Sequence, residues 1–334
     1  MWQVFSNTLN QILVLFLLIA AGYIIVKLKI VPADGVKILS KLENTLIIPA
    51  LVMGTFISNF TVDKLSEYGK LFLQSFLLFF VTTALAVLFS RLVYKDDYLR
   101  KIALYGLSFA NFGFMGNAVV LGIYGQEFFA KYAFFVIPLW IMIYLWGVPA
   151  LLLSSANKEK REGEGTFKAL LKKLRPLLNP MFVGMIIGMI IGIIPGVSGV
   201  VSDSFAGQAV NSLGGCMSVI AMIITGMTIA NTDIIYILKN ARIYILTAVR
   251  LLVIPLLFIL VFTFVPQGSF IDATFLTCAI CAISMPLGLN TIVVPGAYGK
   301  DTRDAAGMAL ISHTLSVVTI PLIFMLFEKL VLKV

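Results

Sequence analysis

Two short polar segments interrupt the otherwise apolar sequence of this chain. The first reads Asn-Phe-Gly-Phe-Met-Gly-Asn at Asn111–Asn117, and the second reads Ser-Met-Pro-Leu-Gly-Leu-Asn-Thr at Ser284–Thr291. Glycine is a poor helix former, and Pro286 lacks an amide donor and crowds the preceding turn. We therefore expect both segments to be helix breaks that expose amide, hydroxyl and backbone groups.

The groups at such breaks suit an anion. A helix that restarts after a break presents free N–H groups and roughly half a positive charge at its first turn. Two such ends that converge form an anion site, to which side-chain amides and hydroxyls add donors. A single asparagine in a membrane more often joins two helices, but four polar groups at two breaks favour a site. The residues expected to bind the substrate are Asn111, Gly113, Met115, Gly116, Asn117, Pro286, Gly288, Asn290 and Thr291.

The composition places these breaks in a membrane. Of the 334 residues, 60% are hydrophobic and 12% are charged, and the mean hydropathy is +1.02, which leaves too little polar surface for a soluble protein of this size. Ten apolar runs each reach the roughly 20 residues of a membrane helix. The second run is the least regular, because Lys37, Lys41 and Glu43 leave only its later part apolar and Pro49 interrupts that part, so nine spans are the alternative. The runs lie near 8–26, 36–60, 70–92, 100–123, 129–153, 177–195, 208–230, 241–265, 273–297 and 305–331.

The two breaks occupy corresponding places in the two halves of the chain. A similar hexapeptide follows each break, Gly-Ile-Tyr-Gly-Gln-Glu at Gly122–Glu127 and Gly-Ala-Tyr-Gly-Lys-Asp at Gly296–Asp301. Such paired breaks point to a substrate site built from discontinuous helices. Because each half holds an odd number of spans, the second half must enter the membrane in the opposite sense. We therefore expect an all-α membrane protein of two inverted five-helix repeats, with broken fourth and ninth helices that cross.

The basic residues predict the orientation. Loops after the odd-numbered spans carry 19 of the 25 lysine and arginine residues, and the opposite face carries five. By the positive-inside rule, both termini face away from the cytoplasm. The net charge of +9 therefore reflects topology, and no nucleic-acid partner is implied.

A polar segment divides the chain. It separates a first repeat at 1–154 from a second at 176–334, and 155–175 form a basic cytoplasmic linker. The linker is either solvated or contains an interfacial helix that contacts membrane lipids, since its apolar residues recur at helical spacing. Those residues are Phe167, Leu170, Leu171 and Leu174.

Four other polar residues fall within or beside the predicted spans. Arg250 either supports the anion site, by raising the local potential or pairing with carbonyl groups, or reaches the cytoplasmic face. His313 and Gln74 either support the site or join helices by hydrogen bonds, and His313 has the further option of relaying a proton. Glu43 is expected near the cytoplasmic surface, paired with Lys41 or a neighbouring basic side chain.

Several classes of protein are disfavoured. All sixteen carboxylates fall in loops or near span ends, so the membrane-centre aspartate pairs of a sodium/proton exchanger or an aspartyl protease are missing. No protease, phosphate-loop or metal-ligand spacing occurs, and the chain holds one histidine. We expect no enzyme activity, no metal site and no cofactor, with Na⁺ or H⁺ open as a coupling ion.

The two signatures resemble those of a known family. The run N-F-G-F-M-G-N-A-V-V-L-G-I-Y-G from Asn111 to Gly125 resembles the fourth span of the auxin efflux carrier family, in which proline usually stands where this chain has Ala118. The segment from Met285 to Pro321 resembles that family's ninth and tenth spans. The likeness extends over the whole chain in span count, basic central loop and outward termini. The short central loop is similar to that of bacterial members, related to plant auxin carriers and to permeases proposed for malate or malonate.

This resemblance implies a mechanism. Spans one, two, six and seven would form a scaffold, and spans three to five with eight to ten a moving transport domain, in a fold like that of bile-acid symporters and NhaA. The crossover would hold a substrate carboxylate and move by elevator-type alternating access. A homodimer in a bacterial inner membrane is implied as well.

The function that follows is secondary transport of a small organic carboxylate, similar to auxin or to malate and malonate. A sodium-coupled organic anion symporter is the alternative within the same class. A ligand sensor that does not transport is the alternative from a different class. Substrate identity and transport direction are open at this point.

Overall fold

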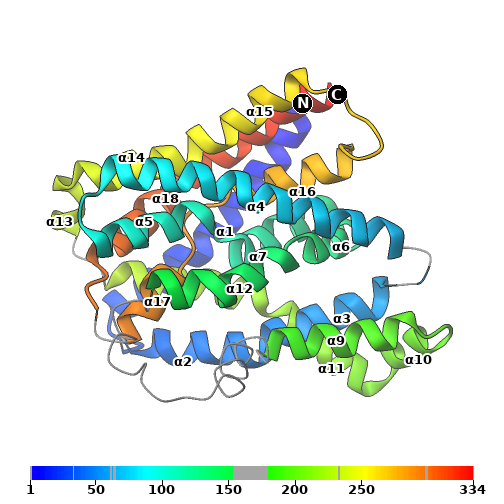
Figure 1. The fold of residues 1–334 in the computed structure, drawn as a ribbon. Helices are drawn as coiled ribbons and strands as arrows, with labels where there is room; N and C mark the ends of the chain where they lie inside the picture. Colours follow the sequence, from blue (N-terminus) through cyan, green and yellow to red (C-terminus); the bar gives the residue numbers. More distant parts are fainter. Residues whose placement is uncertain are drawn as a thin grey trace, which may run out of the picture.

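The computed structural model describes residues 2–32, 34–60, 62, 65–152, 180–231, 234–297 and 300–333. Within these ranges the regular elements are helices, and the one extended pairing is an isolated bridge between Ala110 and Leu287 (Figure 1). The all-α prediction is therefore confirmed for this part of the chain. The predicted linker at 155–175, and Tyr298 and Gly299 of the second hexapeptide, lie outside the described residues.

The first half of the chain forms a series of α-helices with short π-helical stretches, labelled η, between them. Its elements are α1 (Trp2–Lys27), α2 (Gly35–Leu42), η1 (Glu43–Ile47), α3 (Ile48–Asn59), α4 (Leu65–Val93), α5 (Asp97–Ser108), η3 (Phe112–Gly116), α6 (Asn117–Phe135), α7 (Ile137–Met142) and η4 (Ile143–Leu152).

The second half is built in the same way. Its elements are α9 (Pro180–Ile193), α10 (Val197–Asp203), α11 (Phe205–Gly215), α12 (Met217–Ala230), α13 (Ile234–Lys239), α14 (Ala241–Ala248), η6 (Val249–Val253), α15 (Ile254–Phe264), α16 (Ala273–Ile283), α17 (Asn290–Ala297), α18 (Arg303–Phe327) and η7 (Glu328–Leu332).

Three prolines within the predicted spans lie inside or just after π-helical turns. Pro49 and Pro255 stand just after η1 and η6, and Pro149 lies inside η4. Local π-helical geometry lets a membrane helix absorb the amide donor that proline lacks. The expectation that Pro49 interrupts the second span is therefore wrong, because helical backbone runs on from α2 through η1 to α3.

Five stretches of the described chain are long and apolar enough to cross a bilayer. Each forms one helix or two or three successive helical elements. They are Ser66–Val93, Asn117–Met142, Phe205–Ala230, Ala241–Phe264 and Arg303–Leu332. A multi-pass membrane protein is confirmed at this level, and the ten-span topology stays a prediction.

Glycines set the closest helix contacts. A Cβ at Gly226 of α12 would lie 1.9 Å from the carbonyl oxygen of Ile19 in α1. Along α9, three glycines face carbonyl oxygens of α3, where a Cβ would lie at 2.5 to 2.7 Å. Small residues at such spacing let membrane helices approach backbone to backbone. These glycines of α9 are Gly184, Gly188 and Gly192.

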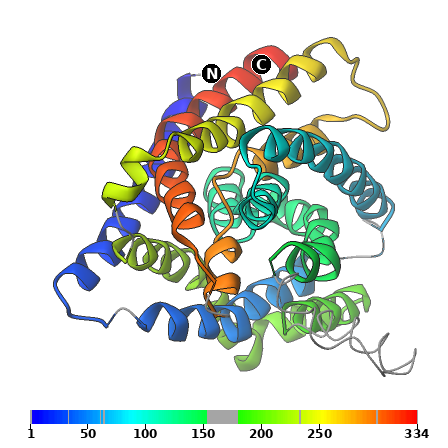
Figure 2. The same ribbon diagram turned by 60° about the vertical axis from the view of Figure 1, so that its left-hand side comes forward.

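The two ends of the chain lie together. Both views place the start of α1 beside the end of α18 (Figures 1 and 2). Along their length α1 and α18 are also in contact. This arrangement fits the expectation that the two termini lie on one side of the membrane.

Candidate substrate site at the two helix breaks

The first break lies at the start of the polar run that predicts it. α5 ends at Ser108, Phe109 is extended with a φ of −121° and ψ of 100°, and helical backbone resumes at Phe112. The prediction of a break across 111–117 is therefore too late, because η3 and α6 continue through Ala118. The glycines of the run serve packing instead. A Cβ at Gly113 would lie 2.3 Å from the indole ring of Trp140.

The second break lies where the sequence predicts it. α16 ends at Ile283, and α17 begins at Asn290. At the start of α17, the Thr291 hydroxyl donates to the carbonyl oxygen of Gly288 at 2.8 Å. Pro286 stands in the non-helical stretch between the two helices, as its missing amide donor requires.

The two breaks lie against each other. The backbone N–H of Asn111 donates to the carbonyl oxygen of Pro286 at 2.7 Å. One residue away on each side, Ala110 and Leu287 form the antiparallel bridge. Backbone groups that each break frees are therefore paired across the contact, as burial in a membrane demands.

Arg250 fixes this contact from η6. Its guanidinium donates to the carbonyl oxygens of Leu107, Ile283 and Met285 at 2.8 to 3.0 Å. Leu107 and Ile283 belong to the last turns of α5 and α16, where helices leave acceptors unpaired, and Met285 lies in the second break. Only 2% of Arg250 is exposed. Of the expected roles, pairing with carbonyl groups is confirmed and reaching the cytoplasmic face is wrong.

Two neighbouring residues of α18, Ser312 and His313, each form a hydrogen bond with one of the two breaks. The Ser312 hydroxyl accepts from the backbone N–H of Leu287 at 3.2 Å. His313 is buried, with Nδ1 2.8 Å from the carbonyl oxygen of Ala309 and Nε2 3.0 Å from the amide nitrogen of Asn111. Since a carbonyl only accepts, Nδ1 carries the proton and Nε2 accepts from Asn111. His313 thereby orients the Asn111 amide.

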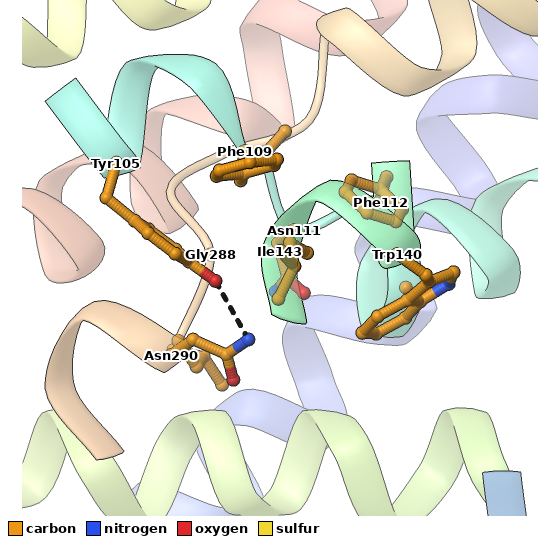
Figure 3. A pocket seen from close by; sticks show the side chains of 11 residues that line it. Tyr105, Phe109, Asn111, Phe112, Trp140, Ile143, Gly288 and Asn290 are labelled. Atoms are coloured by element: carbon orange, nitrogen blue, oxygen red, sulfur yellow. Dashed lines mark hydrogen bonds between the residues drawn. The ribbon is translucent and has the colours of Figure 1, made fainter. Parts of the chain in front are cut away.

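A small cavity lies between the two restarted helices (Figure 3). It holds about 20 Å³, which is room for about one water molecule. The first residues of η3 and of α17 both line it. Asn290 donates from its amide to the Tyr105 hydroxyl at 3.1 Å across one side of the cavity. The lining residues are Tyr105, Phe109, Ala110, Asn111, Phe112, Gly113, Trp140, Ile143, Gly288, Leu289 and Asn290.

Other predicted site residues lie outside this cavity. Asn117 is 5% exposed and lines a separate small cavity between α3 and α6. Met115 is buried, and Gly116 packs closely beside the Tyr132 hydroxyl. Gln74 lies on α4, where its amide donates to the carbonyl oxygen of Phe270 and its side chain lines an apolar cavity beside α15.

Two aromatic side chains of the site escaped the sequence reasoning. Tyr105 lies in the last turn of α5, and Trp140 lies in α7. Both sit in apolar runs of ordinary helical character, so composition gives no signal for them. Trp140 borders both the cavity of Asn111 and the cavity of Asn117.

Glu43 is not placed as expected. Its side chain is fully buried at 0% exposure, and neither carboxylate oxygen has a hydrogen-bond partner among the described residues. Lys41 is exposed instead. At 100° per residue, two residues turn a helix by about 200°, so the two side chains point in nearly opposite directions. The predicted pairing of Glu43 with Lys41 is therefore wrong.

Comparison with known proteins identifies the family. A family model described as membrane transport protein matches residues 8–324. The chain belongs to this family. The resemblance to auxin efflux carriers is thereby confirmed. An uncharacterized transporter of Methanocaldococcus jannaschii is 27% identical over 166 residues. That match covers 49% of this chain and 51% of the relative, so the chain spans about half the length of the relative it matches.

Proposed function

We propose that this membrane transport protein moves a small organic carboxylate, which binds between the first turns of η3 and α17. The observation that carries the proposal is that both helix starts line one cavity. Each start carries the partial positive charge of a helix amino terminus. A carboxylate between them would be stabilised by both charges.

Side chains around the cavity add to this chemistry. Asn111 uses one amide hydrogen toward His313 and keeps a second for a ligand, since an amide nitrogen carries two. Arg250 adds a full positive charge behind the breaks, while its hydrogen bonds are spent on carbonyl groups. The site is therefore electropositive, but the charge of Arg250 does not form an ion pair with the substrate that would hold it too tightly for release.

The cavity as described is small. A carboxylate needs more than the present 20 Å³, so binding requires the wall formed by Trp140 and Ile143 to separate from the breaks. Trp140 and Ile143 lie in predicted span five, so this opening would be a movement within the proposed transport domain. Elevator-type alternating access, in which that domain moves relative to a scaffold, would then carry the bound substrate. The substrate class we propose is similar to auxin or to malate and malonate.

Helix contacts support a ten-span architecture of two inverted repeats. α1 packs closely on α12, which correspond to predicted spans one and seven. α3 packs closely on α9, which correspond to predicted spans two and six. Exchanging the two repeats turns one pair into the other, as an inverted repeat requires. These spans would be the scaffold, and the rest the transport domain of a homodimer in a bacterial inner membrane.

Counterflow in proteoliposomes tests the function. Vesicles loaded with unlabelled malate or indole acetate should take up the labelled acid, with and without sodium outside. We expect Asn111→Ala to abolish this uptake, because it removes a donor at the start of η3, while the variant keeps the wild-type fold. The matched control is Asn231→Ala, at the end of α12 and far from the cavity lining.

The outcomes separate the alternatives. Wild-type flux in Asn111→Ala would overturn the site. Uptake that needs external sodium would identify a sodium-coupled organic anion symporter. Binding of an acid in a thermal-shift screen, with no counterflow under any gradient, would identify a ligand sensor.

A further inference from the structure

Glu43 is a buried acid that the proposed site does not use. It opens η1, a single π-helical turn inside the second predicted span. Such turns occur frequently at functional sites. Both carboxylate oxygens are shielded and without hydrogen-bond partners in the described part of the chain.

No cation compensates this carboxylate among the described residues. η1 packs against α2, α3, α9, α11 and α12. The sequences of α3, α9, α11 and α12 contain no Asp, Glu, Lys, Arg, His, Tyr or Cys. The charged groups of α2 are Lys37 and Lys41, which are both exposed and form no ion pair with Glu43 within 4.0 Å.

An ionised carboxylate in this position is strongly disfavoured. Burying an unpaired charge costs several kcal/mol even after the protein relaxes. The neutral acid avoids that cost, so Glu43 holds a proton in the closed conformation. Ionised Glu43 requires water, which reaches it only when η1 parts from the helices that cover it. These helices correspond to predicted spans two, six and seven, so the parting is a movement within the proposed scaffold.

We propose that Glu43 is the proton-binding site of this transporter, which stays protonated while the helices are closed and exchanges its proton with water when they part. The inference rests on the proposed transport function and adds its coupling ion. The step is an acid–base equilibrium in which the carboxylate takes one proton from water on one side and returns it to water on the other. Cotransport of one proton with a monocarboxylate anion would be electroneutral.

The first experiment is infrared difference spectroscopy of the full chain in lipid across a pH series. We expect a protonated carboxyl band at neutral pH that Glu43→Gln removes. Glu328→Gln is the matched control, because Glu328 also opens a π-helical turn, η7, but is half-buried. Absence of a band specific to Glu43 would overturn the proposal. If Glu43→Gln expresses poorly, Glu43→Asp keeps the carboxyl group, and its band should shift.

The second experiment is transport of malate or indole acetate under an imposed pH gradient. In Glu43→Gln, accumulation should fall to the level measured without a gradient, while counterflow keeps the wild-type rate. A purely structural role would lower both, and an unchanged gradient response would contradict proton coupling. If the wild-type protein transports neither acid, the proposed substrates fail, and the infrared band still decides whether Glu43 holds a proton.

Discussion

Gly113 and Trp140 show at the residue scale how one atom shapes the site. Gly113 is needed for its lack of a side chain, because the indole of Trp140 occupies the place of a Cβ. The same indole walls the cavity between the helix starts. The contact between Gly113 and Trp140 therefore sets the position of the indole ring, and with it the shape of the cavity.

We expect Gly113→Ala to destabilise the protein by about 1 to 3 kcal/mol, the usual cost of overpacking a core. The added methyl displaces Trp140, so transport should change along with stability. Gly199→Ala is the control, since Gly199 lies in α10 with nothing within 4 Å of an added Cβ. Thermal unfolding in detergent measures the stability of both variants, and counterflow measures their transport. Equal melting temperatures for the two variants would show that Trp140 moves away without cost.

At the scale of elements, one side chain from η6 joins the ends of α5 and α16. A helix that stops inside a membrane leaves carbonyl groups without donors. Arg250 supplies donors to three of them, and the planar guanidinium suits this fan of acceptors better than an ammonium group would. Arg250 therefore holds the two breaks in register.

Arg250→Met should lower the melting temperature, because each buried carbonyl left without a donor costs about 1 to 3 kcal/mol. Arg250→Lys should recover only part of the loss. Arg242→Met is the control, as Arg242 is exposed at the start of α14 and stacks over Tyr94. Wild-type stability in Arg250→Met would contradict the clamp.

On the scale of the whole molecule, two helix pairs and the two termini bear on the topology. The pairs α1 with α12 and α3 with α9 are those that an inverted repeat would exchange. The ends of the chain lie side by side (Figure 2). Both features fit ten spans with outward termini, a topology that labelling can test.

Single cysteines should report the orientation. With Cys216, Cys278 and Cys281 replaced by alanine, Gly268→Cys should react with an impermeant maleimide added outside intact cells. Lys95→Cys should react only after the membrane is opened. Both positions are exposed in loops, so access to solvent does not distinguish them. The reverse pattern would invert the predicted topology.

The sequence alone determined the membrane class, the helical fold, the family and the place of the second break. These follow from local properties, namely apolar run length, proline's missing donor and the polar residues in an apolar context. Asn111 and Asn290 were found in this way, and both line the cavity.

Only the tertiary structure decided which groups meet. Tyr105 and Trp140 join the cavity because distant helices bring them there, and Asn117 faces another cavity because the helix turns it away. The position of the first break also depended on packing, since Gly113 and Gly116 make room for aromatic neighbours. The burial of Glu43 has the same origin. A residue's type sets what it can bind, whereas its partners depend on contacts between segments far apart in the chain.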